Sequence, residues 1–415
     1  MYENKQAWTD HALLNILSQE QLYNILLKKY AWAQKYIYYY VYIAYVARDN
    51  IEPILDSIQE YDRCNYSSRK AYQYLKKYTN KIKFATIIPT CNRPEAIKYL
   101  LNYVAVSYRR LGVDVIIYDS SDNDQTQNVV QTIQNSGYYN VIYKKYSGVF
   151  DGFSLDHKII DAYKEFADQY DYLWLCRDGL VPVIDEIIEK INYYAAQHVE
   201  CFIVDTKSRT NFLEIEKEYS TLEDCNDFLL EQSSRLQTLG MLILSSKLAL
   251  KMIQCVPLSD ATYSLWQMAA PFHLFAQAPY KIVFFSRNVF AMNPDASTTH
   301  FWGKAKKALE QWARRWYLII TNMPQVYNNA KEKCLMVYTV DFHPFTYKTV
   351  LDMRGWGHLN LKLVTQYKEY LIKTTKTHYN YFLMVSLIPP CISRWISRRV
   401  EKHPNLAHQL RESFL

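Results

Sequence analysis

The chain has 415 residues and a net charge of +7, from 48 Lys and Arg against 41 Asp and Glu. Hydrophobic residues make up 49% and charged residues 21%, which is globular composition and excludes a disordered chain. The length predicts two or three structural units. The basic residues are scattered and no nucleic-acid-binding motif is present, so we expect no nucleic-acid partner. A modest basic surplus suits an anionic ligand or an anionic lipid surface.

The cysteines indicate the compartment. None of the eight belongs to a Cys-x-x-Cys pair, and Cys176 and Cys201 lie in apolar runs, where a reduced thiol acts as a small hydrophobic side chain. This pattern predicts neither a structural zinc site nor a disulfide framework. The N-terminus lacks the layout of a secretory signal, and no run reaches the ~20 apolar residues that span a bilayer. We therefore expect a cytoplasmic protein, at most peripheral on the inner face of the cell membrane.

Three zones follow one another along the chain. Residues 1–80 show helix-period patterns, which predict an N-terminal helical region. In residues 81–300, β-branched apolar runs alternate with helix-period segments, which predicts an α/β fold with a mostly parallel sheet covered on both faces. Residues 301–415 are helical again, with an aromatic and basic ending near Trp395 that suits lipid headgroups and solvent equally.

The individual elements of the three zones can be read from the same patterns. Strands are expected at 84–88, 113–118, 141–143, 172–176, 201–205 and 281–285. One helix is expected to begin at residue 95 and another to run through residues 129–133. Further helices are expected at 155–166, 184–196, 302–320 and 366–373.

Ligands of an open parallel sheet bind beyond the carboxyl ends of its strands. Residues 89–94, Pro-Thr-Cys-Asn-Arg-Pro, follow the first strand and offer backbone N–H groups and an arginine to an anion. Helix capping by Thr90 or Asn92 explains this segment equally well. Asp119 closes the second strand, where its carboxylate can accept hydrogen bonds from a ribose or a base. The simple alternative at this strand end is that Asp122 or Asp124 caps the next helix.

Charged residues also follow the later strands. Asp178 can hold a divalent cation and Arg177 can act as a fixed cation, although an Arg–Asp ion pair at a strand exit is the simple alternative. Asp260 opens an aromatic-rich segment either as a helix N-cap or as a general base. His300 lies in a polar loop after the last strand, where a surface histidine is the usual case.

The runs ATIIPTCNRP, VDVIIYDSSDND and YDYLWLCRDGLVP, in this order, resemble the family 2 inverting glycosyltransferases with the GT-A fold. The resemblance covers roughly residues 82–300. It implies transfer of a sugar from a nucleotide-sugar donor, with a UDP-sugar as the leading candidate, to a hydroxyl of a glycan, lipid-linked or polymer acceptor. A composition rich in Tyr, Lys and Asn and poor in Gly suggests an AT-rich bacterial genome, and with it bacterial surface glycoconjugate synthesis.

The resemblance also implies roles for single residues. The nucleotide pocket would be lined by Pro89, Thr90, Asn92, Arg93 and Arg177, and Asp119 would hold the uracil or ribose. Asp178 falls at the metal-binding Asp-x-Asp motif and His300 matches the late histidine of that site, so a divalent cation, Mn or Mg, is expected. Asp260 lies where the family has its catalytic base. Residues 238–242 look like the acceptor-side loop before a helix.

Three departures from the family pattern are visible. The Asp-x-Asp motif reads Cys176-Arg177-Asp178, so one carboxylate is missing and Arg177 stands in a position to replace part of the metal's role. The usual Ala-Arg-Asn start of the helix after the third strand reads Leu-Asp-His-Lys at residues 155–158. Asp260 is followed by Ala-Thr and not by an acidic residue, so its role depends on position alone.

Two other functions compete with an active transferase. The incomplete motif supports a non-catalytic nucleotide-sugar-binding or scaffold protein with a degenerate GT-A site. A sugar-1-phosphate nucleotidyltransferase needs a glycine-rich loop with Arg and Lys near the first strand, and the sequence has none. The flanking helical regions could form the acceptor site, a contact in a homo-oligomer or a surface that rests on a membrane.

Overall fold

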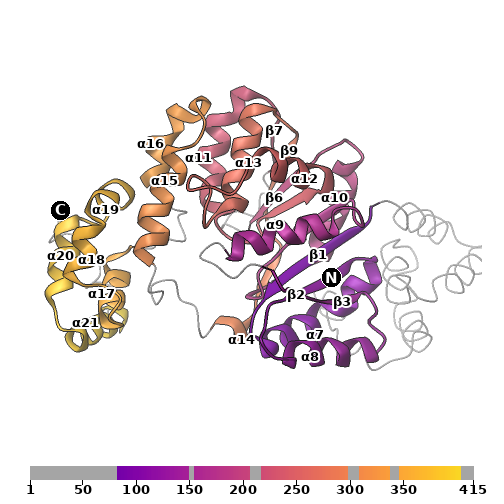
Figure 1. Cartoon of the computed structure of the whole chain (residues 1–415), viewed down its shortest axis with the longest axis horizontal. Helices are drawn as coiled ribbons and strands as arrows, with labels where there is room; N and C mark the ends of the chain where they lie inside the picture. The colour runs from indigo at the N-terminus through magenta and orange to yellow at the C-terminus, as the bar shows by residue number, and fades with distance from the viewer. Residues whose placement is uncertain (1–81, 149–153, 206–215, 298–307, 337–344, 403–415) are drawn as a thin grey trace, which may run out of the picture.

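The computed structural model describes residues 82–148, 154–205, 216–297, 308–336 and 345–402. The expected N-terminal helical region, residues 1–80, lies outside these ranges. An α/β body fills most of the described chain, and a group of C-terminal helices stands at one side of it (Figure 1). No helix in the described ranges is long and apolar enough to cross a bilayer.

The body is built on an eight-stranded mixed sheet, which confirms the predicted α/β class. Its strand order is β3-β2-β1-β4-β8-β6-β9-β7. The first four strands along the chain are β1 (Phe84–Thr90), β2 (Asp114–Asp119), β3 (Val141–Lys145) and β4 (Tyr172–Leu175). β1 pairs in parallel with β2 and β4, and β2 pairs in parallel with β3. The others are β6 (Cys201–Asp205), β7 (Glu216–Tyr219), β8 (Leu242–Ser245) and β9 (Ile282–Asn288). Of these, β8 is antiparallel to both its neighbours and β7 is antiparallel to β9.

Helices cover both faces of the sheet. Figure 1 shows α7 (Pro94–Leu111) and α8 (Gln125–Asn135) together on one side and α9 (Ser154–Phe166) with α12 (Ser246–Cys255) on the other. The remaining body helices are α10 (Ile188–Ala195), α11 (Cys225–Leu236), α13 (Trp266–Gln277) and the short α14 (Pro294–Ser297). The helix expected at 184–196 is a 3-10 turn (Ile184–Glu186) followed by α10, because Ile187 leaves helical geometry at φ −128°.

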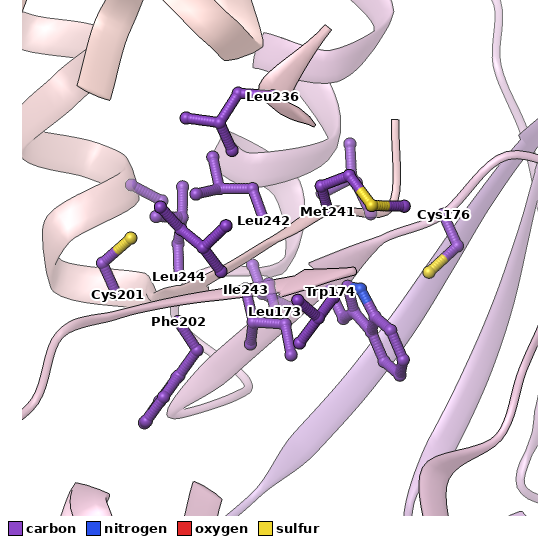
Figure 2. Close-up of a cluster of buried hydrophobic side chains, with 14 of the residues drawn as sticks. Leu173, Trp174, Cys176, Cys201, Phe202, Leu236, Met241, Leu242, Ile243 and Leu244 are labelled. Atoms are coloured by element: carbon purple, nitrogen blue, oxygen red, sulfur yellow. The ribbon is translucent and has the colours of Figure 1, made fainter. Parts of the chain in front are cut away.

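A buried hydrogen bond fixes the centre of the sheet. β4 is buried along its whole length, and the indole Nε1–H of Trp174 donates to the carbonyl of Gly240 at 2.6 Å. Gly240 has φ +116°, and a Cβ there would lie 3.2 Å from the Phe290 ring. Figure 2 shows Trp174 beside Met241 and the side chains of β8. Residues 238–242 therefore lead directly into a central strand, and their expected acceptor role stays a prediction.

Replacing Trp174 by phenylalanine is expected to lower the free energy of unfolding by about 1–3 kcal/mol. The buried carbonyl of Gly240 would lose its donor, and an unpaired buried carbonyl costs about this much. Urea denaturation of the full chain measures the effect. The exposed Trp395 provides the control, since Trp395→Phe should change stability by less than about 0.5 kcal/mol. Equal losses in the two variants would contradict the role given to the hydrogen bond.

The C-terminal helices have a hydrophobic core of their own. This second core gathers buried side chains such as Trp312, Phe345 and Phe382, whereas Trp316 and Tyr327 belong to the core of the body. The elements are a π-helical turn (Glu310–Arg315), α15 (Trp316–Thr321), α16 (Asn328–Met336), α17 (Tyr347–Gly355), α18 (Leu361–Gln366), α19 (Lys368–Thr374), α20 (Tyr379–Leu387) and α21 (Pro390–Lys402). The body core thus continues past residue 301, and the domain boundary expected there stays a prediction.

Two helices expected from the sequence differ in extent. The one at 302–320 is described only from residue 308, and its residues 310–315 form the π-helical turn. The one at 366–373 is interrupted at Tyr367, which caps both α18 and α19 with φ −99° and ψ 12°.

Candidate functional site

Three of the selected segments meet at one edge of the sheet. β1 lies between β2 and β4 and runs parallel to both, so the residues that follow these strands are brought side by side. The backbone N–H of Ser120 donates to the carbonyl of Thr90 at 3.0 Å, which joins the ends of β1 and β2. The Asn92 N–H donates to the Ser121 hydroxyl at 2.7 Å, and Asn92 has φ 54°.

Asp178 joins the selected residues at this edge of the sheet. Its Oδ2 accepts a hydrogen bond from the Thr90 hydroxyl at 3.0 Å, and its Oδ1 accepts one from Arg93 Nη1 at 2.7 Å. The side chain is largely buried, so both charges of the Arg93–Asp178 pair act in a medium of lowered dielectric. Pro89 precedes this cluster as a buried residue of β1.

The simple structural alternatives for this segment are wrong. α7 begins at Pro94 with Arg93 as its N-cap residue, and no side chain caps it, so neither Thr90 nor Asn92 is a helix cap. The ion pair of Asp178 is made by Arg93, 85 residues away, and not by its neighbour Arg177.

Arg177 has donor capacity that the described part of the chain does not use. Its side chain is mostly buried, and its Nε has no hydrogen-bond partner within the described residues. Burial lowers the pKa of Arg177, the Asp178 carboxylate raises it and the Arg93 charge lowers it. Two arginines therefore lie close enough to repel each other at the end of β4, which is an arrangement that favours an anion.

Asp119 lies at the expected strand end, but its carboxylate is fully engaged inside the protein. It is 0% exposed. Its Oδ1 accepts hydrogen bonds from the Ser121 N–H at 2.9 Å and the Ser121 hydroxyl at 2.5 Å, and its Oδ2 accepts one from the Tyr143 hydroxyl at 3.1 Å. Asp119 thus orders the turn after β2, and its contact with a uracil or ribose stays a prediction.

Lys158 on α9 is a member of the cluster that sequence reasoning did not select. Its buried Nζ donates to the carbonyl of Thr90 at 2.8 Å and to the Ser120 hydroxyl at 2.9 Å. Burial lowers the pKa of Lys158 to about 8, while the Asp119 and Asp178 carboxylates raise it. The available signal was a lysine on the apolar helix face of Ala162 and Phe166, four and eight residues later.

Asn293 is a second residue that sequence reasoning did not select. Its side-chain Nδ2 donates to the Asp178 carbonyl at 2.9 Å and to the Ala96 carbonyl at 2.7 Å, and the residue is fully buried. It follows β10 (Phe290–Met292), which pairs with β5 (Leu180–Pro182). Asn293 therefore ties the Asp178 loop to the first turn of α7.

Asp156 connects α9 to the segment that carries Asp260. Its carboxylate accepts hydrogen bonds from the Ser264 N–H at 2.6 Å and the Trp266 N–H at 3.2 Å, and burial raises its pKa to about 6. Asp156 is two residues before Lys158, so the 259–266 segment is held at the start of the helix that reaches the strand ends.

Asp260 is open to solvent. Its side chain is 91% exposed, and its Oδ1 lies 3.5 Å from Arg315 Nη1. α13 begins at Trp266 with Leu265 at its N-cap, so Asp260 is not a helix cap and that alternative is wrong. The guanidinium of Arg315 also lies 4.2 Å from the centre of the Tyr263 ring. A proton acceptor at this position would be accessible, and its catalytic role stays a prediction.

The described residues do not fit a divalent-cation site. Both carboxylate oxygens of Asp178 already accept hydrogen bonds, and nowhere in the described ranges do three or more His, Cys, Asp or Glu side chains converge. His300 lies outside the described residues, so its expected part in a metal site stays a prediction.

An open hollow of about 440 Å³ adjoins the strand ends beyond β3. Lysines and acidic residues both line it. Lys144 pairs with Glu165, and the Nζ of Lys145 donates to the Ser121 carbonyl, in the turn that Asp119 orders. Tyr118 and Tyr146 supply aromatic walls. The hollow offers flat apolar rings and charge next to the cluster.

No protein-family model and no curated protein matches the chain. Among solved structures, it is similar to residues 1–349 of TarS from S. aureus, at 12% identity over 78% of this chain and 92% of that one, with a TM-score of 0.43. It is also similar to the mannosyltransferase PcManGT from Pyrobaculum calidifontis in complex with GDP-Man and Mn2+, at 12% identity, 74% and 87% coverage and a TM-score of 0.43.

A third similar structure is glucosyl-3-phosphoglycerate synthase from Mycobacterium tuberculosis in complex with Mn2+, UDP and glucosyl-3-phosphoglycerate. It is 11% identical, with 58% of this chain and 78% of that one covered and a TM-score of 0.34. Identities and TM-scores this low assign no residue role, substrate or metal to the chain.

Proposed function

We propose that the chain is an inverting glycosyltransferase. It would move a sugar from a nucleotide-sugar donor, a UDP-sugar first of all, to a hydroxyl of a glycan, lipid-linked or polymer acceptor in bacterial surface glycoconjugate synthesis. The observation that carries the proposal is the cluster at the ends of β1, β2 and β4, where Arg93, Arg177 and Lys158 surround Asp178. The sequence resemblance over residues 82–300 supports the same function.

The charge of the cluster suits a diphosphate. Arg93, Arg177 and Lys158 carry three positive charges against the two carboxylates of Asp119 and Asp178, so one is in excess. A guanidinium presents two parallel N–H donors to a phosphate, and a fixed cation stabilises the negative charge that grows on the leaving diphosphate. We assign Arg177 to the donor phosphates, Arg93 to the placement of Asp178, and the adjoining Thr90 and Asn92 to the pocket wall.

A general base activates the acceptor hydroxyl in this proposal. Asp260 takes the proton of the acceptor hydroxyl while that oxygen forms its bond to the anomeric carbon and the bond to the diphosphate breaks. One displacement of this kind inverts the configuration at the anomeric carbon. The accessible carboxylate of Asp260 and its attachment to α9 through the Asp156 contacts are consistent with this role.

The divalent cation, Mn or Mg, that the resemblance implies would need ligands beyond the described residues. Asp178 alone is a poor site because it is a single carboxylate and each of its two oxygens already accepts a hydrogen bond. His300 belongs to the part of the chain that would have to supply the rest. We therefore assign stabilisation of the negative charge on the leaving diphosphate to Arg177 and not to a metal ion.

Binding of a nucleoside diphosphate is expected to weaken about fivefold as the pH rises through about 8. Lys158 is charged below this pH and neutral above it, so its attraction for the diphosphate is present at low pH and lost at high pH. Calorimetric titration across the range measures the change. Lys158→Arg should bind well on both sides of pH 8, because arginine keeps its charge. If nucleotide binding by Lys158→Arg still weakened near pH 8, the group that titrates would be a residue other than Lys158.

The function is tested by titrating the full chain with UDP, GDP and CDP, each with and without manganese. Binding of one nucleotide supports the proposal and identifies the donor class. If that binding needs manganese, ligands outside the described residues complete a metal site and the phosphate role of Arg177 is wrong. Absence of binding to all three nucleotides contradicts the function.

A second candidate function is a non-catalytic protein that binds a nucleotide sugar or acts as a scaffold. The observation that favours it is the lack of a converging carboxylate set among the described residues, together with the occupied Asp178. Such a protein would bind nucleotide through the same cluster, and only an assay of turnover separates the two functions.

A further inference from the structure

α21 has large apolar side chains on its outward face as well as on its buried one. The buried face carries Val400 together with Ser393 and Ser397, and the two serine hydroxyls donate to the Leu351 carbonyl at 2.9 Å and to the Asp352 carboxylate on α17. The outward face carries Ile392 and Trp395, which are 47% and 60% exposed. A helix that folds only for its own stability buries its large apolar side chains, so the outward ones point to something that covers them.

Close packing explains the small inward residues. A Cβ on Gly355 would lie 3.3 Å from the backbone of Arg394, which shows that α17 and α21 approach each other closely. Larger inward side chains would separate the two helices. The small serine side chains therefore allow α17 and α21 to pack closely. The packing against α17 does not explain why Trp395 faces outward.

The outward residues form a continuous stripe. Ile392, Trp395 and Arg398 are spaced at i, i+3 and i+6, and the Arg399 guanidinium lies 5.2 Å from the centre of the Trp395 ring. Leu387, at the end of α20 and five residues before Ile392, is 68% exposed. Three large apolar side chains are thus followed by two arginines along α20 and α21, and we call these five residues the α21 face (Leu387, Ile392, Trp395, Arg398, Arg399).

The net charge of the protein is concentrated in this helical unit. Residues 345–400 contain nine Lys and Arg and two Asp and Glu, a net charge of 9 − 2 = +7. The whole chain also has a net charge of +7, so the other residues balance to zero. Within the described residues of α21 up to Val400 there is no acidic side chain, and Arg398 and Arg399 are exposed.

We propose that the α21 face docks on an anionic lipid bilayer, with α21 lying in the plane of the surface. Trp395, Ile392 and Leu387 would enter the boundary between headgroups and acyl chains, and Arg398 and Arg399 would contact lipid phosphates. Two such units with a charge of +7 each repel one another, so charge favours an anionic membrane over a second copy of the chain. This inference adds a place of action to the proposed function and needs no bound nucleotide.

The test is sedimentation of the full chain with lipid vesicles. Vesicles of phosphatidylcholine alone are compared with vesicles in which phosphatidylglycerol replaces part of it. The wild type should bind only the anionic vesicles and should be released by salt. Arg398→Glu/Arg399→Glu should bind at least about 25-fold more weakly, since each basic residue at an anionic surface contributes about fivefold. Trp395→Ala should also bind more weakly while its urea denaturation stays that of the wild type.

Lys362→Glu/Lys376→Glu is the matched control. It makes the same change in net charge with exposed residues of the same unit that lie off the α21 face, and it should bind almost as the wild type does. Equal losses in both double variants would mean that net charge alone drives binding and would overturn the docking face. Absence of binding to anionic vesicles would overturn the proposal too. So would self-association or capture of a protein partner that Trp395→Ala abolishes, since the face would then be a protein interface.

Discussion

Asp260→Asn is expected to lose about 10²–10⁴-fold in turnover while it binds the nucleotide as the wild type does. A general base contributes about this much, and asparagine has nearly the shape of aspartate without its basicity. Because the side chain is 91% exposed and its one described ion pair is at 3.5 Å, the substitution should leave the fold intact. Transfer is measured as release of the nucleoside diphosphate in the presence of acceptor.

Asp122→Asn is the control for this experiment. Asp122 is an exposed carboxylate three residues after β2, and it does not cap α8, whose N-cap residue is Asp124. Its removal should leave turnover unchanged. Full activity in Asp260→Asn would place the base elsewhere. If the wild type binds a nucleotide but transfers no sugar to any acceptor, the non-catalytic alternative holds instead.

The strands that sequence reasoning located are those with a local signal. β1, β2 and β6 each contain a run of buried, mostly apolar residues, and such runs predict strands without reference to the rest of the chain. β8 has only four residues and directly precedes a helix. Its antiparallel place between β4 and β6 depends on pairing with distant residues, so no local pattern could show it.

The same distinction applies to the site. Thr90 and Asp178 were found because the rule about strand ends needs only the strands. Two partners of these residues, Lys158 and Asn293, were not found, because they come from far along the chain. Lys158 is 68 residues from Thr90, and Asn293 is 115 residues from Asp178. Arg177 was a natural partner for Asp178 by sequence, but the geometry at the end of β4 gives that contact to Arg93.

Arg177→Ala is expected to weaken binding of a nucleoside diphosphate about 10–100-fold. Hydrogen bonds to a charged group are worth about 1.5–3 kcal/mol, and this guanidinium has an Nε without a partner within the described residues. Removing it breaks no hydrogen bond described in the fold. The substitution relieves the burial of a charge and the repulsion from Arg93 but loses the attraction to Asp178, so stability should change little. Calorimetry measures the affinity, and urea denaturation measures the stability.

The nucleoside without phosphates provides the decisive comparison. If Arg177 binds the diphosphate, Arg177→Ala should leave uridine binding unchanged while UDP binding falls, and the exposed Arg398→Ala should affect neither. Equal losses for uridine and UDP would mean that Arg177 shapes the pocket and does not contact phosphate. If Arg177→Ala left the affinity for UDP unchanged, Arg93 would be the residue that binds the phosphates. Arg93 would then bind the phosphates through N–H groups other than the one on Nη1, which donates to Asp178 at 2.7 Å.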